Sequence, residues 1–543
     1  MSLIRDSAFG ILIRTFSNHK LLKYPEEQEG FVLPAQYSSR GHQSAVSVLL
    51  SSSRGIKVNL EGTSEPSSGS EDSNKETVFV TWYSDHDPEN PQNWSNGRKI
   101  WVSILLFIYT VAAYMGASIY TASEDGIMKK FGVSQTVASL GLILYVLGYG
   151  IAPMILSPLT EIPAIGRNPP YAITFCLFTI LTIPAALLDN IAGLLVIRFL
   201  LGVFCSPALS TVGASYGDFI SPPKMQYVIA LWSVGASSAP VMGPVLAGYA
   251  VEKMGWRWSA WELLWLSAPM TVLLLLTLPE TSSDTILLRR ATRLRSITGC
   301  DNLKHESETR HSHLSPREVA YQALIKPWQI NALDPAVLFT TVYLALGYAI
   351  YYSFFESFPL VYRDIYGFSL GAMGLAFLSM MVGLFITSVF LGCYIYFIAD
   401  KHFAKMGDVP PEARLLPGIF GSICIPVGLF MFAWTSKRSI HWIVSMCSVG
   451  ICHSGVFLIG QAILGYLPFT YPRYAGSLFA ANGLARSLFA GSAVLFSPPM
   501  FEKLGVAGGV SLLGGLSALC IIGMVCLYFF GANLRKKSKF AGS

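Results

Sequence analysis

Charged and titratable side chains inside apolar stretches are the residues of this sequence best suited to chemistry. Arg198, Glu356, His453 and Arg486 each interrupt such a stretch, and Asp218 ends another. A charge within hydrocarbon costs ~3 kcal/mol or more, so it must face a partner or a water-filled cavity. A carboxyl group can carry a proton, and a nearby positive charge helps to eject it by lowering its pKa. These residues indicate proton handling inside a membrane.

Spacing along a helix limits which of these charges can meet. Arg198 and Asp218 are ~30 Å apart if one helix contains both, so each needs its own partner. Arg198 either braces two helices through backbone carbonyls or belongs to a proton pathway, and we favour the second. Arg486 is expected near the middle of the membrane, with Glu356 as one candidate partner. His453 titrates near neutrality, but a hydrogen-bonded structural histidine is the more frequent case.

The elements that position these residues are membrane spans. Only 13% of the 543 residues are charged and 52% are hydrophobic, whereas a soluble domain carries roughly 25% charge. Because about 20 apolar residues cross a bilayer, the sequence predicts twelve spans, at approximately 100–122, 135–158, 171–189, 191–217, 227–251, 258–278, 337–360, 370–398, 415–434, 441–467, 474–497 and 508–531.

Hydrophilic segments divide these spans into two sets of six. We expect a cytosolic, partly disordered amino-terminal region over 1–97, a first bundle over 98–278, a central loop over 279–333, a second bundle over 334–531 and a basic tail over 532–543. Within the first region, residues 36–76 are rich in Ser, Gly and Glu and predict a disordered linker. The first 23 residues predict an amphipathic helix on a membrane surface, with a mitochondrial presequence as the alternative.

The central loop contains a basic run that predicts a second amphipathic helix. Leu287, Ala291 and Leu294 fall on one face of a helix. The basic residues beside them are placed to meet lipid headgroups, namely Arg289, Arg290, Arg293 and Arg295.

The distribution of Lys and Arg in the connections predicts the orientation of the spans. With the amino terminus inside, twenty basic residues fall on the inner side and eight on the outer side. We therefore expect both termini and the central loop to be cytosolic. The net charge of +6 is concentrated beside the spans, which favours contact with anionic lipid over nucleic acid.

Other classes of site have no signal in this sequence. Eight of the nine cysteines lie inside predicted spans, and their spacing suggests neither a disulfide framework nor a metal site. No Gly-x-x-x-x-Gly-Lys-Ser/Thr phosphate loop occurs, so ATP bound to this chain is not the expected energy source. We expect no cofactor, no metal and no enzymatic activity, and a carrier of this kind would draw on an ion gradient.

The fifth span is crowded with small residues and contains two prolines. Gly, Ala and Ser let a neighbouring backbone approach closely, and Pro bends a helix. Gly235, Gly243, Pro244 and Gly248 resemble the antiporter motif of major facilitator superfamily exporters. The resemblance implies that these residues serve gating and helix packing.

Three further stretches resemble the same superfamily. The loop Ser157 to Pro170 resembles its loop motif, with gating residues Glu161, Gly166 and Arg167, although the usual leading Gly is Ser157 and the usual Asp is Glu161. Arg198-x-x-x-Gly202 resembles the fourth-span motif, whose Arg is associated with proton coupling. The segment 87–94, Asp-Pro-Glu-Asn-Pro-Gln-Asn-Trp, resembles the pre-membrane signature of fungal twelve-span drug:proton antiporters of the benomyl and azole resistance type.

Aromatic residues in the seventh span predict a substrate site. Their spacing of three and four residues makes a stripe suited to flat amphipathic molecules, although an interfacial aromatic belt is the alternative for the later ones. Glu356-Ser-Phe-Pro359 resembles the family's seventh-span pattern. The expected substrate-binding residues are Tyr348, Tyr351, Tyr352, Phe355, Gln461 and Asn482.

Together the resemblance implies an all-α membrane protein with the major facilitator fold, twelve transmembrane helices in two six-helix bundles. It implies a monomeric, proton-coupled efflux transporter that exports lipophilic drugs, fungicides or toxic metabolites across the plasma membrane. The expected partners are small lipophilic substrates, protons and lipid, and the proton-coupling residues are Arg198, Asp218, Glu356 and Arg486. The alternatives are an exporter dedicated to one metabolite, toxin or polyamine, and a membrane sensor that does not transport.

Overall fold

The chain was analysed as a computed structural model that describes residues 2–28, 30, 31, 34, 37, 78–310, 321, 325–401 and 410–541. Its regular structure is almost entirely helical, and two short strands, β1 (Val78–Phe79) and β2 (Leu303–Lys304), pair in parallel. The linker predicted over 36–76 falls outside the described residues, except for Tyr37.

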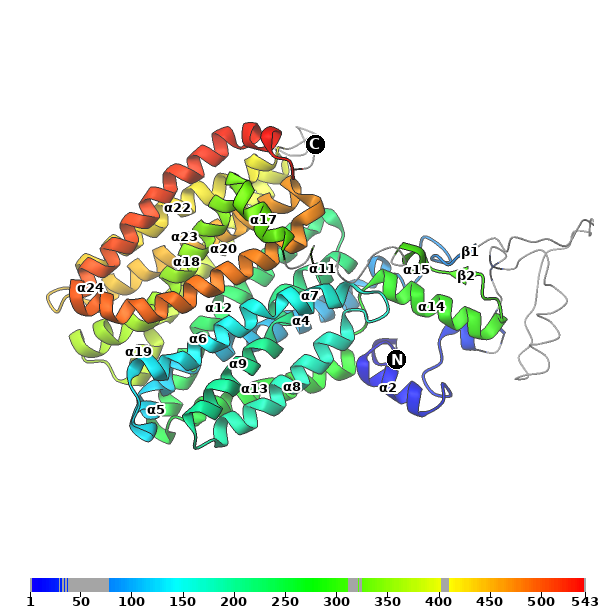
Figure 1. Ribbon diagram of the computed structural model, residues 1–543, viewed down its shortest axis with the longest axis horizontal. Helices are drawn as coiled ribbons and strands as arrows, with labels where there is room; N and C mark the ends of the chain where they lie inside the picture. Colours follow the sequence, from blue (N-terminus) through cyan, green and yellow to red (C-terminus); the bar gives the residue numbers. More distant parts are fainter. Residues whose placement is uncertain are drawn as a thin grey trace, which may run out of the picture.

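Twelve membrane spans build the body of the protein, as predicted. Among the described residues, ten helices are long and apolar enough to cross a membrane. One of these, α24 (Ala475–Lys537), consists of two spans joined at Gly505, whose φ of 68° only glycine adopts readily; Figure 1 shows the two halves running side by side. The fourth span completes the set and is broken into α9 (Ile191–Cys205), α10 (Pro207–Ser210) and α11 (Val212–Phe219).

Six spans form each bundle. The first bundle contains, besides the fourth span, α4 (Asn96–Ser118) with α5 (Glu124–Phe131), α6 (Gln135–Ile151) with α7 (Pro153–Glu161), α8 (Asn168–Leu187), α12 (Pro222–Met254) and α13 (Trp258–Thr277). The second contains, besides α24, α18 (Pro335–Phe358) with the π-helix η6 (Pro359–Ile365), α19 (Leu370–Ala376) with α20 (Leu378–Tyr394) and the π-helix η7 (Ile395–Ala399), α22 (Leu416–Thr435) and α23 (Trp442–Thr470).

Capping residues fix where the helices that line the bundle interface begin. Ser134 Oγ accepts a hydrogen bond from the backbone N–H of Val137 and so caps α6. Asp334 caps α18 in the same way, accepting from Ala336 and Val337, and Pro335 occupies the first helical position. A side-chain acceptor satisfies N–H groups that have no partner within the helix, and Pro there loses no hydrogen bond.

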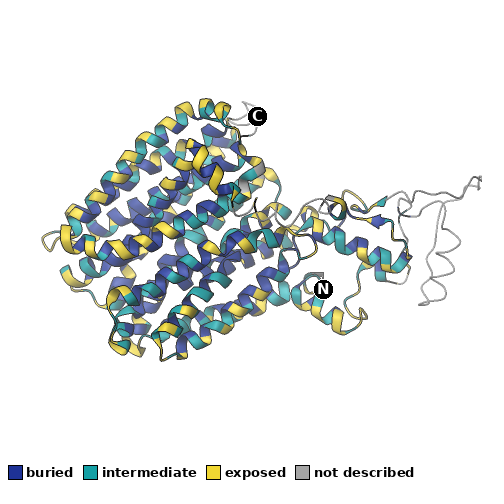
Figure 2. Ribbon diagram, in the orientation of Figure 1, coloured by how far each residue is buried: buried dark blue, intermediate teal, exposed yellow. Residues whose placement is uncertain are grey.

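The distribution of buried residues matches a protein surrounded by lipid. Figure 2 shows buried residues where helices face one another and exposed residues along the outer faces of the spans. Many of the exposed side chains on those outer faces are large and apolar, including Phe385, Phe390, Leu519, Ile522 and Phe529. Exposed apolar surface of this extent does not occur on a soluble monomer.

Both termini lie at the same end of the bundles (Figure 1), which we call the terminal end; the other is the opposite end. At the terminal end, residues 2–28, 78–94 and 283–310 form a small unit, the terminal module. Its helices are α1 (Ser2–Arg5), α2 (Ala8–Phe16), α14 (Ser283–Thr298) and α15 (Glu306–Arg310), with the 3-10 turns η1 (Pro25–Glu27) and η3 (Pro91–Asn93). Between the module and α18 lies α17 (Lys326–Leu333). The helix predicted near the amino terminus is α2, which packs against α8 and α13.

The prediction that the arginines of α14 meet lipid headgroups is wrong. All four pair with carboxylates of the chain: Arg289 with Glu280, Arg290 with Glu26, Asp87 and Glu89, Arg293 with Glu26 and Glu89, and Arg295 with Glu308. The apolar face of the helix packs on β1 and β2 through Ala291 and Leu294. The acids before the first span and the basic helix meet because both lie at the terminal end.

Candidate functional site

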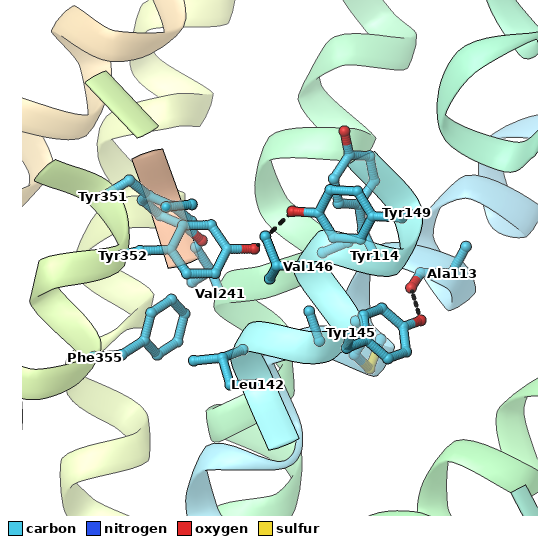
Figure 3. Close-up of a cluster of buried hydrophobic side chains, with 14 of the residues drawn as sticks. Ala113, Tyr114, Leu142, Tyr145, Val146, Tyr149, Val241, Tyr351, Tyr352 and Phe355 are labelled. Atoms are coloured by element: carbon cyan, nitrogen blue, oxygen red, sulfur yellow. Dashed lines mark hydrogen bonds between the residues drawn. The ribbon is translucent and has the colours of Figure 1, made fainter. Parts of the chain in front are cut away.

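An aromatic cluster lies between the two bundles. The hydroxyl groups of Tyr149 on α6 and Tyr352 on α18 are 3.0 Å apart and hydrogen-bonded. The ring of Tyr114 lies 5.8 Å from that of Tyr149, and Tyr348 stacks on Tyr352 at 6.3 Å. Figure 3 shows Tyr149 and Tyr352 reaching toward each other from their two helices, with Phe355 beside Tyr352. We call this aromatic cluster the central chamber, although most of its side chains are buried and packed against one another in this structure.

Polar atoms that point into the chamber region have no partner among the described residues. Neither ring nitrogen of His453 is hydrogen-bonded, although only 5% of the residue is exposed. The same holds for Nδ2 of the buried Asn482, Nε of Arg486 and the hydroxyl of Tyr351, whose ring lies 5.2 Å from His453. An unsatisfied buried polar group costs about 1–3 kcal/mol, so an occupant with complementary polar atoms would be stabilised.

Most of the predicted substrate-binding residues belong to this region. Tyr348, Tyr351, Tyr352 and Phe355 contact one another as neighbouring rings on α18. Gln461 differs, because it lies about 12 Å further along α23 than His453 and takes part in none of the ring or hydrogen-bond contacts described above.

Two carboxyl groups lie at the opposite end of the interface. Gln135 Nε2 of α6 donates to Glu356 Oε2 of α18 at 3.0 Å. One turn further along α6, Ser139 Oγ donates to Glu124 Oε2 at 3.1 Å, and the charges of Glu124 and Glu356 act on each other. Within the described chain, neither carboxylate has a basic group within 4.0 Å. These two groups could therefore hold protons at the boundary between the bundles.

Arg486 does not pair with Glu356, contrary to the partner expected from the sequence. Its guanidinium lies over the ring of Tyr348, 4.7 Å from the centroid. Glu356 instead accepts from Gln135 on the other bundle. Helical position alone placed both residues inside the membrane but could not fix which faces they occupy.

Arg198 ties three helices of the first bundle together. Its Nε donates to the carbonyl of Gly141 and its Nη2 to that of Ala117, both at 3.1 Å. The guanidinium also lies over the rings of Tyr120 and Tyr145, at 4.5 and 4.7 Å. These contacts match the bracing alternative, and the acid whose charge reaches Arg198 is Glu124.

Gly202 accounts for the four-residue spacing between the Arg and the Gly of the Arg-x-x-x-Gly pattern. A Cβ atom at this position would overlap the carbonyl oxygen of Tyr145. The missing side chain lets α9 approach α6 closely, so Arg198 one turn earlier can reach the α6 backbone at Gly141.

Asp218 and Arg167 form an ion pair at the terminal end. Arg167 Nε and Nη2 donate to the two carboxylate oxygens of Asp218 at 2.5 and 3.1 Å, and Thr281 donates to the same carboxylate. Glu161, the acid in the same loop as Arg167, forms no salt bridge with it. Gly166 has a φ of 81° and packs against Glu280, whose carboxylate accepts from the backbone N–H of Arg167.

The small residues of α12 serve two different contacts. A Cβ at Gly235 would overlap Phe107, and one at Gly243 would overlap Ser118 Oγ, both on α4. Gly248 and the carbonyl of Pro244 face α19 of the other bundle instead, where Gly371 and Gly374 leave room for them. These glycines therefore lie at close helix contacts, and α12 continues without a break across Pro240 and Pro244.

Comparison with known proteins identifies the family. The family model described as Major Facilitator Superfamily matches residues 105–494. The chain belongs to the major facilitator superfamily. It is 37% identical to the cycloheximide resistance protein of Candida maltosa, over 99% of both chains. It is 42% identical to the multidrug transporter FLR1 of Candida glabrata, over 86% of this chain and 85% of that one.

A solved structure shares the fold of this superfamily member. The proton:xylose symporter XylE superposes with a TM-score of 0.57, covering 80% of this chain and 96% of that one at 11% sequence identity. At this identity the likeness bears on the fold alone. It agrees with the two six-helix bundles described above.

Sequence reasoning missed three residues of this superfamily member that the interface brings together. Glu124 was not selected because it falls just beyond the predicted first span, although two adjacent acids, Glu124 and Asp125, follow that span directly. Tyr114 and Tyr149 were read only as apolar span residues. Their neighbours in the chamber come from other helices, and no local pattern reports such contacts.

Proposed function

We propose that the chain is a proton-coupled exporter of small lipophilic compounds, including drugs, fungicides and toxic metabolites, and that it acts as a monomer. The observation that carries the proposal is the central chamber, with unpaired polar groups facing it and two carboxyl groups, Glu124 and Glu356, beside it at the bundle interface. The similarity to a fungal cycloheximide resistance protein and a fungal multidrug transporter supports export of toxic compounds.

Contacts at both ends of the interface support alternating access. At the terminal end, Gln226 Nε2 and the Tyr227 hydroxyl of α12 donate to Asp400, which follows η7. At the opposite end, Arg363 pairs with Asp125 at 2.5 Å. A partly exposed contact of this kind is worth about 1 kcal/mol or less. Either end can therefore open at small cost, as a rocking carrier requires.

The two carboxyl groups supply a means of coupling. When both are ionised, their like charges repel each other across the interface and favour opening of the opposite end. A proton taken up there neutralises one of the two carboxylates, which removes the repulsion and permits closure, and its loss toward the terminal end completes the exchange. In this proposal Arg198 fixes α4, α6 and α9 around Glu124 and adds a positive charge that favours release of the proton.

Transport in inverted vesicles tests the proposal, with radiolabelled cycloheximide as the first probe. We expect a protonophore to abolish accumulation, whereas ATP depletion under an imposed pH gradient leaves it intact. Glu124→Gln and Glu356→Gln should each lose gradient-driven accumulation but retain exchange of substrate across the membrane, while the exposed Glu502→Gln behaves as wild type. Accumulation that follows ATP and ignores the protonophore would contradict the proposal.

A panel of toxic compounds separates broad export from the narrower alternative. Expression in a host that lacks its own pumps should raise resistance to several unrelated compounds. Resistance to one compound alone indicates a dedicated exporter, and the absence of uphill flux for every compound indicates a membrane sensor.

We also propose that the protein lies in the plasma membrane with its terminal end in the cytosol. The twenty-to-eight bias of basic residues supports this orientation. Protease added to sealed cells should leave the loop over 279–333 intact and should cut it after permeabilisation. Cleavage in sealed cells would reverse the orientation.

A further inference from the structure

Arg486 is a permanent positive charge in the central chamber, and no carboxylate of the described residues compensates it. Its guanidinium faces the ring of Tyr348, and its buried Nε has no hydrogen-bond partner. No acidic oxygen among the described residues lies within 4.0 Å of it. Arginine stays protonated at any physiological pH, so the charge belongs to the chamber in every transport state.

The groups around Arg486 are neutral at physiological pH. The hydroxyls whose electrostatic effect reaches it come from three helices and belong to Tyr114, Tyr149, Tyr348 and Tyr352. Asn482 lies one turn earlier on the same helix. Glu124 and Glu356, the two carboxyl groups described above at the bundle interface, form their hydrogen bonds with Ser139 and Gln135. The aromatic faces offset part of the guanidinium charge, but no anion neutralises it.

An uncompensated charge in a buried site discriminates between ligands. A cation entering the site would meet a like charge at reduced dielectric, whereas an anion would gain both attraction and hydrogen bonds from Nε. A neutral ring system with an acceptor atom would keep the stacking and the hydrogen bond without the Coulomb term. The aromatic surface can therefore bind ligands of all three charge types. The guanidinium determines the order of their affinities.

We propose that Arg486 sets the charge selectivity of the chamber, which accepts anionic or neutral aromatic compounds and rejects lipophilic cations of the same size. The proposal rests on the proposed function as an exporter, because the chamber is taken as the substrate site. It names Arg486 as a specificity residue that touches the substrate. It also assigns the unpaired donors Nε of Arg486 and Nδ2 of Asn482 to acceptor atoms of the substrate.

Binding of a matched series of dyes to the purified protein in detergent tests the proposal without a membrane potential. Dansylglycine, dansylamide and dansylcadaverine share one ring system and are anionic, neutral and cationic. We expect the wild type to bind dansylglycine on the order of tenfold or more tighter than dansylcadaverine, as expected for one charge at reduced dielectric. Equal affinities, or a preference for the cation, would overturn the proposal.

Substitutions at Arg486 locate the selectivity. Arg486→Gln should erase the difference between the anion and the cation while leaving dansylamide binding within about threefold, and Arg486→Lys should retain the order of affinities. Lys503→Gln, which removes an exposed positive charge elsewhere, should change nothing. An unchanged preference in a monodisperse Arg486→Gln protein would overturn the assignment, and the wild-type ranking remains decisive should that variant fail to fold.

Transport assays distinguish failure of this proposal from failure of the proposed function. Proton-driven uptake of dansylamide into inverted vesicles tests export alone, since that dye carries no charge. If dansylamide is taken up but the charged dyes bind with equal affinity, the charge selectivity is refuted and the proposal of export stands. If the dyes bind with the expected order of affinities but none is taken up, export is refuted and the proposed charge selectivity of the site stands.

Discussion

Arg290 and Asp87, which are 203 positions apart in the sequence, form a buried ion pair with two hydrogen bonds, Nη1–Oδ2 at 2.6 Å and Nη2–Oδ1 at 3.2 Å. Only 1% of the Arg290 side chain is exposed. Glu26 and Glu89 contact the same guanidinium. The pair joins the segment that enters the first span to the helix of the central loop, so it holds the terminal module together.

Loss of the arginine from this cluster should destabilise the terminal module. Arg290→Met leaves three acids buried beside one another, and removal of one partner of a buried pair costs about 3–5 kcal/mol. We expect limited proteolysis within α14 to accelerate strongly. Arg295→Met removes a more exposed pair with Glu308, worth about 0–1 kcal/mol, and should cleave as wild type; equal rates in the two variants would contradict the structure.

The terminal module should open in acid. Burial raises the pKa of Asp87, but hydrogen bonds from Arg290 and from the backbone N–H groups of Tyr83 and Glu89 outweigh it and hold that pKa below its ordinary value. A depressed pKa stabilises the folded form above the unfolded pKa of about 3.9, and this stability is lost as the pH falls through the folded pKa.

Spin labels at Thr292 and Lys20 measure that opening. The distance between them should stay constant from pH 7 to about 4, where the carboxylate of unfolded Asp would begin to protonate, and broaden below it. Asp87→Asn should broaden the distribution at pH 7 and make it less sensitive to acid, whereas the exposed Asp85→Asn should follow the wild type. If the distribution of distances between the two labels broadened as the pH rises, the prediction would be contradicted.

The close contact of α12 with α4 should be essential for transport. Leu at Gly243 would overlap Ser118 and the backbone of Ile119, and overpacking typically costs about 1–3 kcal/mol, enough to bias two states of similar energy. We expect Gly243→Leu to reach the membrane but to lose efflux. Gly515→Leu is the control, because a Cβ atom at Gly515 would have open space around it. Normal efflux in Gly243→Leu would refute the role of the contact.

Arg198 should matter for coupling as well as for packing. Arg198→Ala removes two hydrogen bonds to carbonyls and a positive charge that acts on Glu124, so we expect substrate to move without its proton. Arg198→Lys keeps the charge and one donor and should retain part of the coupling. The test is to measure substrate-induced proton movement in proteoliposomes at matched protein levels. If Arg198→Ala couples protons as the wild type does, Arg198 has a bracing role only.

Much of the fold could be predicted because span length and apolar composition are local properties. The twelve spans and the tight packing at Gly243 follow from them. The fourth span breaks between Cys205 and Val212, and nothing in the hydropathy of that stretch distinguishes the break from a continuous helix.

Partners in the site were harder to predict because each depends on which helix faces which. Arg167 and Glu161 belong to the same loop, yet Arg167 pairs with Asp218, 51 positions away. The arginines of α14 were assigned to lipid because the helix was considered alone, before the acids at 87 and 89 were known to lie beside it. Sequence patterns report the neighbours of a residue along its helix, and these partners come from other segments.

The approach of α12 to α19 bears on how this protein can evolve. There the two bundles meet through the carbonyl of Pro244 and through glycines at 248, 371 and 374, so this contact is largely backbone and leaves little room for an added side chain. The chamber, by contrast, is built from side chains that can be exchanged one at a time. Side chains of the chamber can therefore change by mutation while the backbone contact between the bundles stays unchanged.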